Sequence, residues 1–308
     1  MSISLLGRIS ENLLLPKDRL DYLIRSAPHR YKVYPVAKRS GPGVRIIAQP
    51  AREVKRLQYW VIKNIFPLFP IHNSATGYVL GRNILANATP HALHPYMLKL
   101  DFKDFFPSIK GCDFLDYAKD IKDLQLPSED LERLSRILFW KPKLNPELQL
   151  SIGAPSSPYL SNAIMFEFDF RVTEYCSKHE IIYTRYADDM TFSMEKKELR
   201  GEAFREIKKI LNELRYPRLK INKRKTVYGS KAHRRMVTGL ILSNDGIVSL
   251  GRNRKRRIRA QIHHFINSKL SERERNYLRG MLAFARDIEP DFVRRMERKY
   301  GTGRINSI

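Results

Sequence analysis

The chain has 308 residues, 43% of them hydrophobic, which is enough for about two domains with a buried core. Its two cysteines, Cys112 and Cys176, argue against a disulfide framework and favour a cytoplasmic location, and no apolar run approaches the ~20 residues of a membrane span. The net charge of +25 is concentrated in residues 201–308, which hold 28 Lys and Arg against 10 Asp and Glu, so we expect a polyanionic partner, either nucleic acid or an anionic membrane.

The N-terminal region predicts a helix, a hairpin and a second helix. Apolar residues at helical spacing in residues 1–15, without a cleavage site, favour a short amphipathic helix over a signal peptide. Two strand-like runs, Tyr31–Val36 and Val44–Ala48, flank the turn-forming residues Ser40–Gly43. Residues 52–66 then show helical periodicity and predict a longer helix.

A short buried strand is expected to end at Asp101. Alternation over residues 96–102 puts Leu98, Leu100 and Phe102 on one face of that strand, and Asp101 falls on the other. The carboxylate is then either a solvated strand end or part of a functional site. This segment alone does not distinguish the two.

A hairpin with two adjacent acids follows a loop rich in glycine and proline. Within residues 151–162, Gly153 permits close approach of a ligand to the backbone, and Asn162 or the serine before it would cap the next helix. β-Forming residues on both sides of Asp188 and Asp189 then predict a hairpin with the acids at its tip.

The acids of the strand end and of the hairpin suggest a metal site. Unpaired carboxylates near a core are costly unless a cation neutralises them, and Mg²⁺ suits hard oxygen ligands. We hypothesise that Asp101 and Asp188 hold two Mg²⁺ ions about 3.5–4 Å apart, with Asp189 as an auxiliary carboxylate. One ion would activate a sugar hydroxyl, and the other would stabilise a leaving pyrophosphate. The alternative is a pair of acids in a solvated turn.

The C-terminal region predicts a small basic helical bundle. A basic helix over Arg252–Asn267, a second helix capped by Ser271 and a third helix from about Pro290 follow one another. The basic face of the first helix includes Arg256 and Arg257, and we expect it to bind the phosphates of a duplex.

Several motifs resemble those of reverse transcriptases. Asp101, in its Asp-x-x-x-Phe-Phe setting, resembles motif A, and the Tyr-Ala-Asp-Asp of residues 186–189 resembles motif C. The Gly-x-Pro-x-Ser-Pro of residues 153–158 resembles motif B, although this chain has Ile152 where the family usually has Gln, which puts any contact of that Gln in doubt. Residues 219–226 resemble motif D.

Two short signatures are similar to those of the retron branch of this family. The sequence from Asn87 to His91 matches Asn-Ala-x-x-His. Val237, Thr238 and Gly239 match Val-Thr-Gly. Together they favour a retron enzyme over the reverse transcriptase of a group II intron or a diversity-generating element, over an RNA-dependent RNA polymerase and over a catalytically idle RNA-binding scaffold. Taken singly, each signature has a simpler interpretation. The first would be a turn, and the second would be the end of a strand.

The resemblance implies an α+β right-hand polymerase fold with fingers, an antiparallel-sheet palm and a helical thumb. The N-terminal helix and fingers would occupy residues 1–95, and the palm residues 96–240 with a fingers insertion at about 113–150. The basic helical thumb would occupy residues 241–308.

Roles for individual residues also follow from the resemblance. Lys225 of motif D would act beside the three acids by protonating the departing pyrophosphate. Six residues would contact the nucleotide, with Phe106 as a steric gate against a ribose 2′-hydroxyl: Arg45, Arg52, Asp104, Phe105, Phe106 and Gly153. The two signatures and the thumb would recognise RNA through Asn87, His91, Val237, Thr238, Gly239, Arg256 and Arg257. The alternative interpretation is that the basic residues are solvated and that the aromatic residues belong to the core.

The chain is therefore expected to be the RNA-directed DNA polymerase of a retron. The resemblance implies priming from a guanosine 2′-hydroxyl of its own structured noncoding RNA, which is template and primer, and a branched RNA-linked single-stranded DNA product, commonly used in antiphage defence. Expected partners are that RNA, the DNA product and deoxynucleoside triphosphates. We also expect a host RNase H as a partner, because the sequence shows no RNase H domain, and a retron effector protein. No membrane partner is expected.

Overall fold

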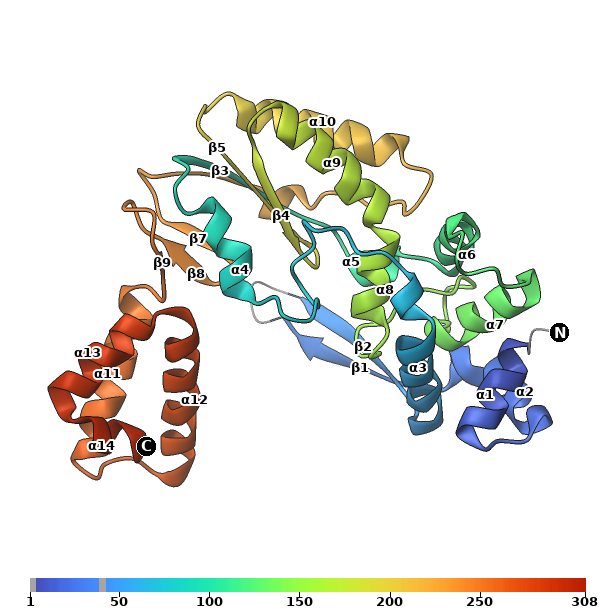
Figure 1. Ribbon diagram of the computed structural model, residues 1–308, viewed down its shortest axis with the longest axis horizontal. Coiled ribbons are helices and arrows are strands. Elements are labelled where there is room, and N and C mark those ends of the chain that lie inside the picture. The colour runs from blue at the N-terminus through green and yellow to red at the C-terminus, as the bar shows by residue number, and fades with distance from the viewer. Residues whose placement is uncertain (1–3, 39–42) are drawn as a thin grey trace.

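The computed structural model describes residues 4–38 and 43–308 (Figure 1). The predicted N-terminal helix is observed as α1 (Leu5–Leu13), and Ser4 caps it by accepting a hydrogen bond from the amide of Gly7. Most of the turn predicted at residues 40–43 lies outside the described residues. Within the described ranges, no helix combines the length and the hydropathy that crossing a bilayer requires.

The N-terminal region packs helices beside a two-stranded sheet. Strands β1 (Tyr31–Ala37) and β2 (Val44–Pro50) pair antiparallel and confirm the predicted hairpin. Helix α2 (Lys17–Ser26) precedes this sheet and α3 (Arg52–Asn64) follows it, and both pack against α7 (Ser128–Leu138).

A four-stranded antiparallel sheet forms the centre of the molecule. Its strands lie in the order β4–β5–β3–β6, with bounds Ile182–Tyr186, Asp189–Met194, Tyr96–Asp101 and Val227–Ser230. Helices α9 (Phe166–Lys178) and α10 (Leu199–Glu213) lie side by side against this sheet (Figure 1). The two helices thereby cover one face of the sheet over β3, β4 and β5.

Short helices connect the central sheet to the N-terminal region. They are α4 (Ile84–Ala88), α5 (Phe105–Ser108), α6 (Gly111–Asp120) and α8 (Ser157–Ile164). One continuous apolar core runs through both parts, with members such as Ile9, Leu57, Leu98, Phe168 and Ile207. The N-terminal region and the central sheet therefore share one interior.

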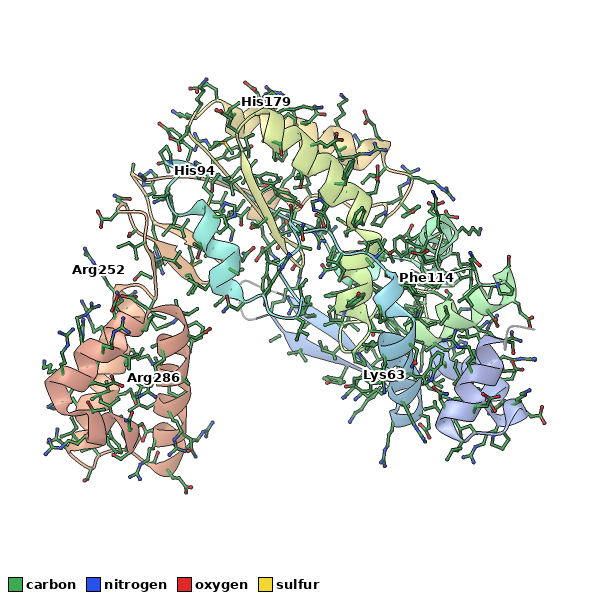
Figure 2. All side chains as sticks on the ribbon, viewed as in Figure 1. Lys63, His94, Phe114, His179, Arg252 and Arg286 are labelled. Atoms are coloured by element: carbon green, nitrogen blue, oxygen red, sulfur yellow. The ribbon has the colours of Figure 1, made fainter. Side chains whose placement is uncertain are left out.

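The C-terminal region has its own apolar core. Its three-stranded sheet is formed by β7 (Arg235–Val237), β8 (Leu240–Leu242) and β9 (Val248–Ser249), and its helices are α11 (Arg252–Ile266), α12 (Glu272–Ile288), α13 (Pro290–Tyr300) and α14 (Thr302–Asn306). Ser271 caps α12, as predicted, and the structure adds a reciprocal hydrogen bond from the backbone of Ser271 to the side chain of Glu274. The four helices lie at the opposite end of the molecule from α1 and α2 (Figure 1), with Arg252 at the end of α11 beside the small sheet (Figure 2).

The second core also contains Ala88 of α4 and Met97 of β3, so the C-terminal region is anchored on the central sheet. Antiparallel sheets with separate helices confirm the predicted α+β class. The domain boundaries near residues 95 and 240 stay predictions.

Candidate active site

Two strands bring the three predicted acids to one edge of the central sheet. β3 and β5 pair antiparallel in a register that sets Asp101 opposite Asp189. The amide of Phe102 also donates to the carbonyl of Asp188 across 3.2 Å. Residues that are 87 or more positions apart in sequence therefore meet at the tip of the β4–β5 hairpin, as the sequence predicted.

The acids repel one another inside a partly buried site. Burial, followed by the negative charges of Asp101 and Asp189, raises the pKa of Asp188 from 3.8 to about 6. Burial also raises the pKa of Asp189, with Asp101 adding to the rise and Lys99 opposing it. Concentrated and incompletely compensated negative charge of this kind favours a cation at the site.

Lys225 supplies part of the compensating charge. Its Nζ donates to Oδ2 of Asp101 across 2.8 Å. The backbone N–H of Asn222 donates to the backbone carbonyl of Asp101 across 2.7 Å. Burial alone lowers the pKa of Lys225, but the hydrogen bond and charge of Asp101 outweigh burial and leave the pKa raised. The ammonium, whose side chain is 53% exposed, therefore keeps its proton beside the acids.

The carboxylates suit divalent cations but do not form a complete metal site on their own. Within residues 4–38 and 43–308, no three His, Cys, Asp or Glu side chains are arranged to hold a metal by themselves. Mg²⁺, however, is usually bound through one or two carboxylates, with substrate phosphates and water as its other ligands. Asp101 and Asp188 match that requirement, because they offer two carboxylates at one sheet edge with unbalanced negative charge.

The segment after Asp101 holds an exposed acid, a half-buried phenylalanine and a buried phenylalanine. Asp104 is exposed with a φ of 47°, and Phe106 is half-buried. Phe105 is buried, and its ring stacks on Phe102 with centroids 5.6 Å apart. The predicted nucleotide contact of Phe105 is therefore corrected, since its side chain belongs to the core.

The motif B loop lies against β2. The amide of Ala48 donates to the carbonyl of Ile152 across 2.9 Å, and a Cβ on Gly153 would lie 3.1 Å from the carbonyl oxygen of Ala48. Gly153 also has a φ of 124°, which L side chains rarely adopt. The glycine thus permits contact with β2 backbone, whereas the sequence predicted contact with a ligand.

Arg45 on β2 and Arg52 at the start of α3 are both exposed. β2, which carries Arg45, lies beside the motif B loop. Their predicted contact with a triphosphate stays a prediction.

The first retron-like signature is buried. Asn87 and His91 are 1% and 0% exposed. The two ring nitrogens of His91 each lie 2.8 Å from a hydroxyl, Oγ of Ser193 on β5 and Oγ1 of Thr184 on β4. Burial lowers the pKa of His91 to about 3, so the ring is neutral. Direct RNA contact by Asn87 and His91 is therefore corrected, because both side chains are enclosed by protein.

The second signature forms a hairpin turn that touches the first. Val237 is buried, so its predicted RNA contact is corrected, whereas Thr238 and Gly239 form the loop between β7 and β8. Both loop residues have positive φ, the pattern of a type I′ turn. Nδ2 of Asn87 lies 3.5 Å from Oγ1 of Thr238, a bond that sequence reasoning missed because 151 residues separate the two.

The thumb arginines are exposed as predicted. Arg256 and Arg257 both lie on the exposed face of α11. The Arg257 guanidinium lies over the ring of Tyr277 on α12, 5.0 Å from its centroid. Contact with RNA stays a prediction for both residues.

Sequence reasoning also missed a buried charged group behind the acids. Arg185 directly precedes Tyr-Ala-Asp-Asp, is 0% exposed and forms an ion pair with Asp169 of α9. Its position on a strand whose other residues are apolar or weakly polar was the available signal. Asn162, predicted to cap a helix, lies inside α8 and bonds to Arg185.

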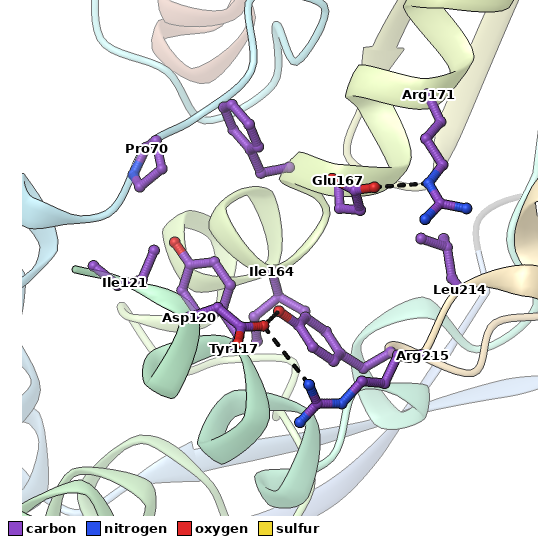
Figure 3. A pocket seen from close by; sticks show the side chains of 11 residues that line it. Pro70, Tyr117, Asp120, Ile121, Ile164, Glu167, Arg171, Leu214 and Arg215 are labelled. Atoms are coloured by element: carbon purple, nitrogen blue, oxygen red, sulfur yellow. Dashed lines mark hydrogen bonds and ion pairs between the residues drawn. The ribbon is translucent and has the colours of Figure 1, made fainter.

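A separate cavity of about 360 Å³ lies between α6, the junction of α8 and α9, and residues 214–216 (Figure 3). At its rim, Tyr216 donates to Asp120 across 2.7 Å, and Arg171 donates to Glu167 across 2.7 Å. The acids of the β4–β5 tip do not line it, so this cavity is not the site described above.

Comparison with known proteins decides the family. The family model described as "Reverse transcriptase (RNA-dependent DNA polymerase)" matches residues 36–258. Retron Ec83 reverse transcriptase of Escherichia coli is 42% identical over 94% of this chain and 93% of its own length. The chain belongs to the retron reverse transcriptases. Retron Ec86 reverse transcriptase of the same species is 35% identical over 94% of this chain and 88% of its own length.

Solved structures give a more distant likeness. A telomerase from Candida albicans in complex with a telomeric RNA fragment matches with a TM-score of 0.47 and 12% identity, over 89% of this chain and 58% of its own. A foamy viral protease-reverse transcriptase with double-stranded DNA matches with a TM-score of 0.44 and 16% identity, over 83% of this chain and 36% of its own.

Membership of the family establishes the activity. This retron reverse transcriptase is an RNA-directed DNA polymerase with a right-hand polymerase fold, and it binds RNA and DNA. The family generally uses divalent metal ions, in agreement with the carboxylates described above.

Proposed function

We propose that this retron reverse transcriptase copies part of its own structured noncoding RNA, which serves as both template and primer. Synthesis would start from the 2′-hydroxyl of an internal guanosine and leave single-stranded DNA joined to RNA through a branch. The similarity to curated retron enzymes over nearly the whole chain supports this proposal most directly. Some parts of the proposal depend on the family resemblance: antiphage defence, template removal by a host RNase H, and an effector protein partner.

We assign the reacting centre to Asp101 and Asp188, with Asp189 as an auxiliary carboxylate and two Mg²⁺ ions as the cofactor. The bound ions would supply activation of the attacking hydroxyl and neutralisation of the pyrophosphate. The shared sheet edge and the raised pKa of Asp188 support the assignment, because both concentrate negative charge where cations are needed.

Lys225 would have two consecutive roles. Before nucleotide binding, its ammonium balances the charge of Asp101, as their 2.8 Å contact indicates. A cation bound at Asp101 would compete with that contact and free the ammonium. A lysine ammonium ordinarily keeps its proton at neutral pH, so the freed Lys225 would have a proton to donate to the pyrophosphate oxygen.

The nucleotide and the RNA would be held by exposed groups. Arg45 and Arg52 would bind the triphosphate, and the half-buried ring of Phe106 would exclude a 2′-hydroxyl. The Thr238–Gly239 turn would lie against the RNA stem, with Asn87 supporting it from inside. Arg256 and Arg257 would bind backbone phosphates.

The nucleic acid that copurifies with the protein tests the proposal. We expect sequencing to recover one structured RNA and a complementary DNA, and digestion of the RNA to leave a ribonucleotide attached to the DNA through a 2′ linkage. The Asp188→Asn variant is the matched control and should carry the RNA without the DNA. Linear DNA with an ordinary 5′ end would contradict the proposed branched product.

A further inference from the structure

The turn that carries Asp188 has an unusual backbone. Tyr186 pairs with Asp189, so Ala187 and Asp188 form a two-residue hairpin loop. Of these two loop residues, Ala187 alone has positive φ, at 56°. This is the sign pattern of a type II′ turn, in which glycine normally takes the first position because a Cβ crowds the backbone there. An alanine at this position must be held by its surroundings.

Arg185 contacts that turn directly. Its Nη1 donates to the carbonyl oxygen of Ala187 across 3.0 Å, and this carbonyl belongs to the peptide that leads into Asp188. The same Nη1 donates to Oδ1 of Asn162 on α8 across 3.1 Å. The other side of the guanidinium binds Asp169 through Nε at 2.9 Å and Nη2 at 2.6 Å. A rigid, planar group with several fixed donors therefore joins two helices to the turn.

A second segment, at Gly77, also packs against the turn. Nδ2 of Asn162 donates to the carbonyl of Gly77 across 2.7 Å. A Cβ added to Gly77 would lie 2.9 Å from the amide nitrogen of Ala187, so the backbone at residue 77 fits closely against the turn. Asn162 thus links Arg185 to the segment that packs on Ala187.

The network acts through geometry and adds little charge to the reacting centre. Asp169 neutralises Arg185 within the core, and Tyr183 also donates to Asp169, across 2.7 Å. All three side chains are buried, so water does not replace these bonds when one of them is lost.

We propose that Arg185 is a positioning residue that fixes the Ala187–Asp188 turn, through the carbonyl of Ala187, in the conformation the reaction requires. This inference rests on the proposed role of Asp188. It also explains why a fully buried arginine stands directly before the acidic motif, on a strand whose neighbours are otherwise apolar or weakly polar.

Two variants of Arg185 test the proposal by different routes. Arg185→Lys keeps the charge but loses the fork that reaches Ala187 and Asp169 together. The pair Arg185→Met with Asp169→Leu removes both buried charges and so avoids an unpaired ion. Each variant should lower the single-turnover rate at saturating nucleotide by about 10- to 100-fold, with RNA affinity unchanged, because small displacements of a catalytic group are this costly.

Metal binding and a rescue separate positioning from general stability. Mn²⁺ binding to the nucleotide-free enzyme, measured by electron paramagnetic resonance, should weaken in both Arg185 variants. Ala187→Gly should partly restore the rate of Arg185→Lys, since glycine adopts positive φ without strain. Tyr183→Phe is the matched control, because it removes a bond to Asp169 and none to the turn, and its rate should stay at the wild-type value.

A wild-type rate and wild-type Mn²⁺ affinity in a folded Arg185 variant would overturn the proposal, as would the failure of Ala187→Gly to restore any activity. Asp188→Asn, assayed in parallel, distinguishes a failure of the assigned reacting centre from a failure of the inference about Arg185. If Asp188→Asn is active, the assignment of the reacting centre fails. If Asp188→Asn is inactive while the Arg185 variants are not impaired, only the inference about Arg185 fails.

Discussion

Asp188→Asn should stabilise the metal-free enzyme while it removes activity. The carboxyl pKa rises from 3.8 to about 6 on folding, because burial and the neighbouring acids disfavour the charged form. At neutral pH this difference corresponds to about 3 kcal/mol, since each tenfold change in proton affinity is worth about 1.36 kcal/mol. The asparagine avoids that cost but cannot serve as an anionic metal ligand.

The gain in stability from Asp188→Asn should depend on pH. A raised carboxyl pKa destabilises the folded state above about pH 6, where Asp188 is ionised in both states. The cost decreases as the pH falls from about 6 and is absent below about 3.8, where the group is protonated in both states. The gain from Asp188→Asn should therefore be about 2–3 kcal/mol at pH 7.5 and much smaller at pH 4.5.

Urea unfolding of both proteins in chelator, at pH 7.5 and 4.5, measures this difference. Asp123→Asn is the matched control, because it removes an exposed acid and should change stability little. Added Mg²⁺ should stabilise the wild type more than the variant, since a ligand that binds only the folded state raises its stability. Equal stability of wild type and Asp188→Asn at pH 7.5 would refute the proposed cost of burying the ionised Asp188 beside the other acids.

Three further variants test other parts of the account. Phe106→Ala should admit ribonucleotides in primer extension, and unchanged sugar selectivity would remove the gate from the proposal. Arg256→Gln with Arg257→Gln should lower the slope of log affinity against log salt concentration by about 1–2, because phosphate contacts release counterions; an unchanged slope would mean that these residues do not touch phosphate. His91→Leu should cost about 2–3 kcal/mol in urea unfolding by removing the hydrogen bonds of the ring to two buried hydroxyls, with RNA affinity of the folded protein retained; loss of RNA affinity alone would restore the predicted RNA contact.

Local patterns in the sequence were sufficient for the elements that carry the acids. Alternation predicted the strand that ends at Asp101 and the hairpin at Asp188, and Ser271 marked the start of α12. These signals are local, because period and capping depend on residues a few positions apart. The meeting of Asp101 with the acids of the hairpin was hypothesised from the two acidic segments, and it is observed in the strand register and in the contact of Phe102 with Asp188.

Polar residues with distant partners could not be placed in this way. His91 looked like a candidate RNA ligand, but its partners on β4 and β5 are about a hundred positions away and enclose it. Arg185 lacked a visible role because Asp169 and Asn162 come from helices whose packing the sequence does not reveal. Buried polar side chains must be bonded, and only the tertiary structure shows to which group.

Single-turnover primer extension by Asp101→Asn and Asp188→Asn, beside a measurement of their RNA affinity, tests the assignment of the reacting centre most directly. We predict that neither variant incorporates deoxynucleotides in Mg²⁺ and that both bind the RNA as the wild type does. Extension at the wild-type rate by either variant would show that the two carboxylates are not the reacting centre.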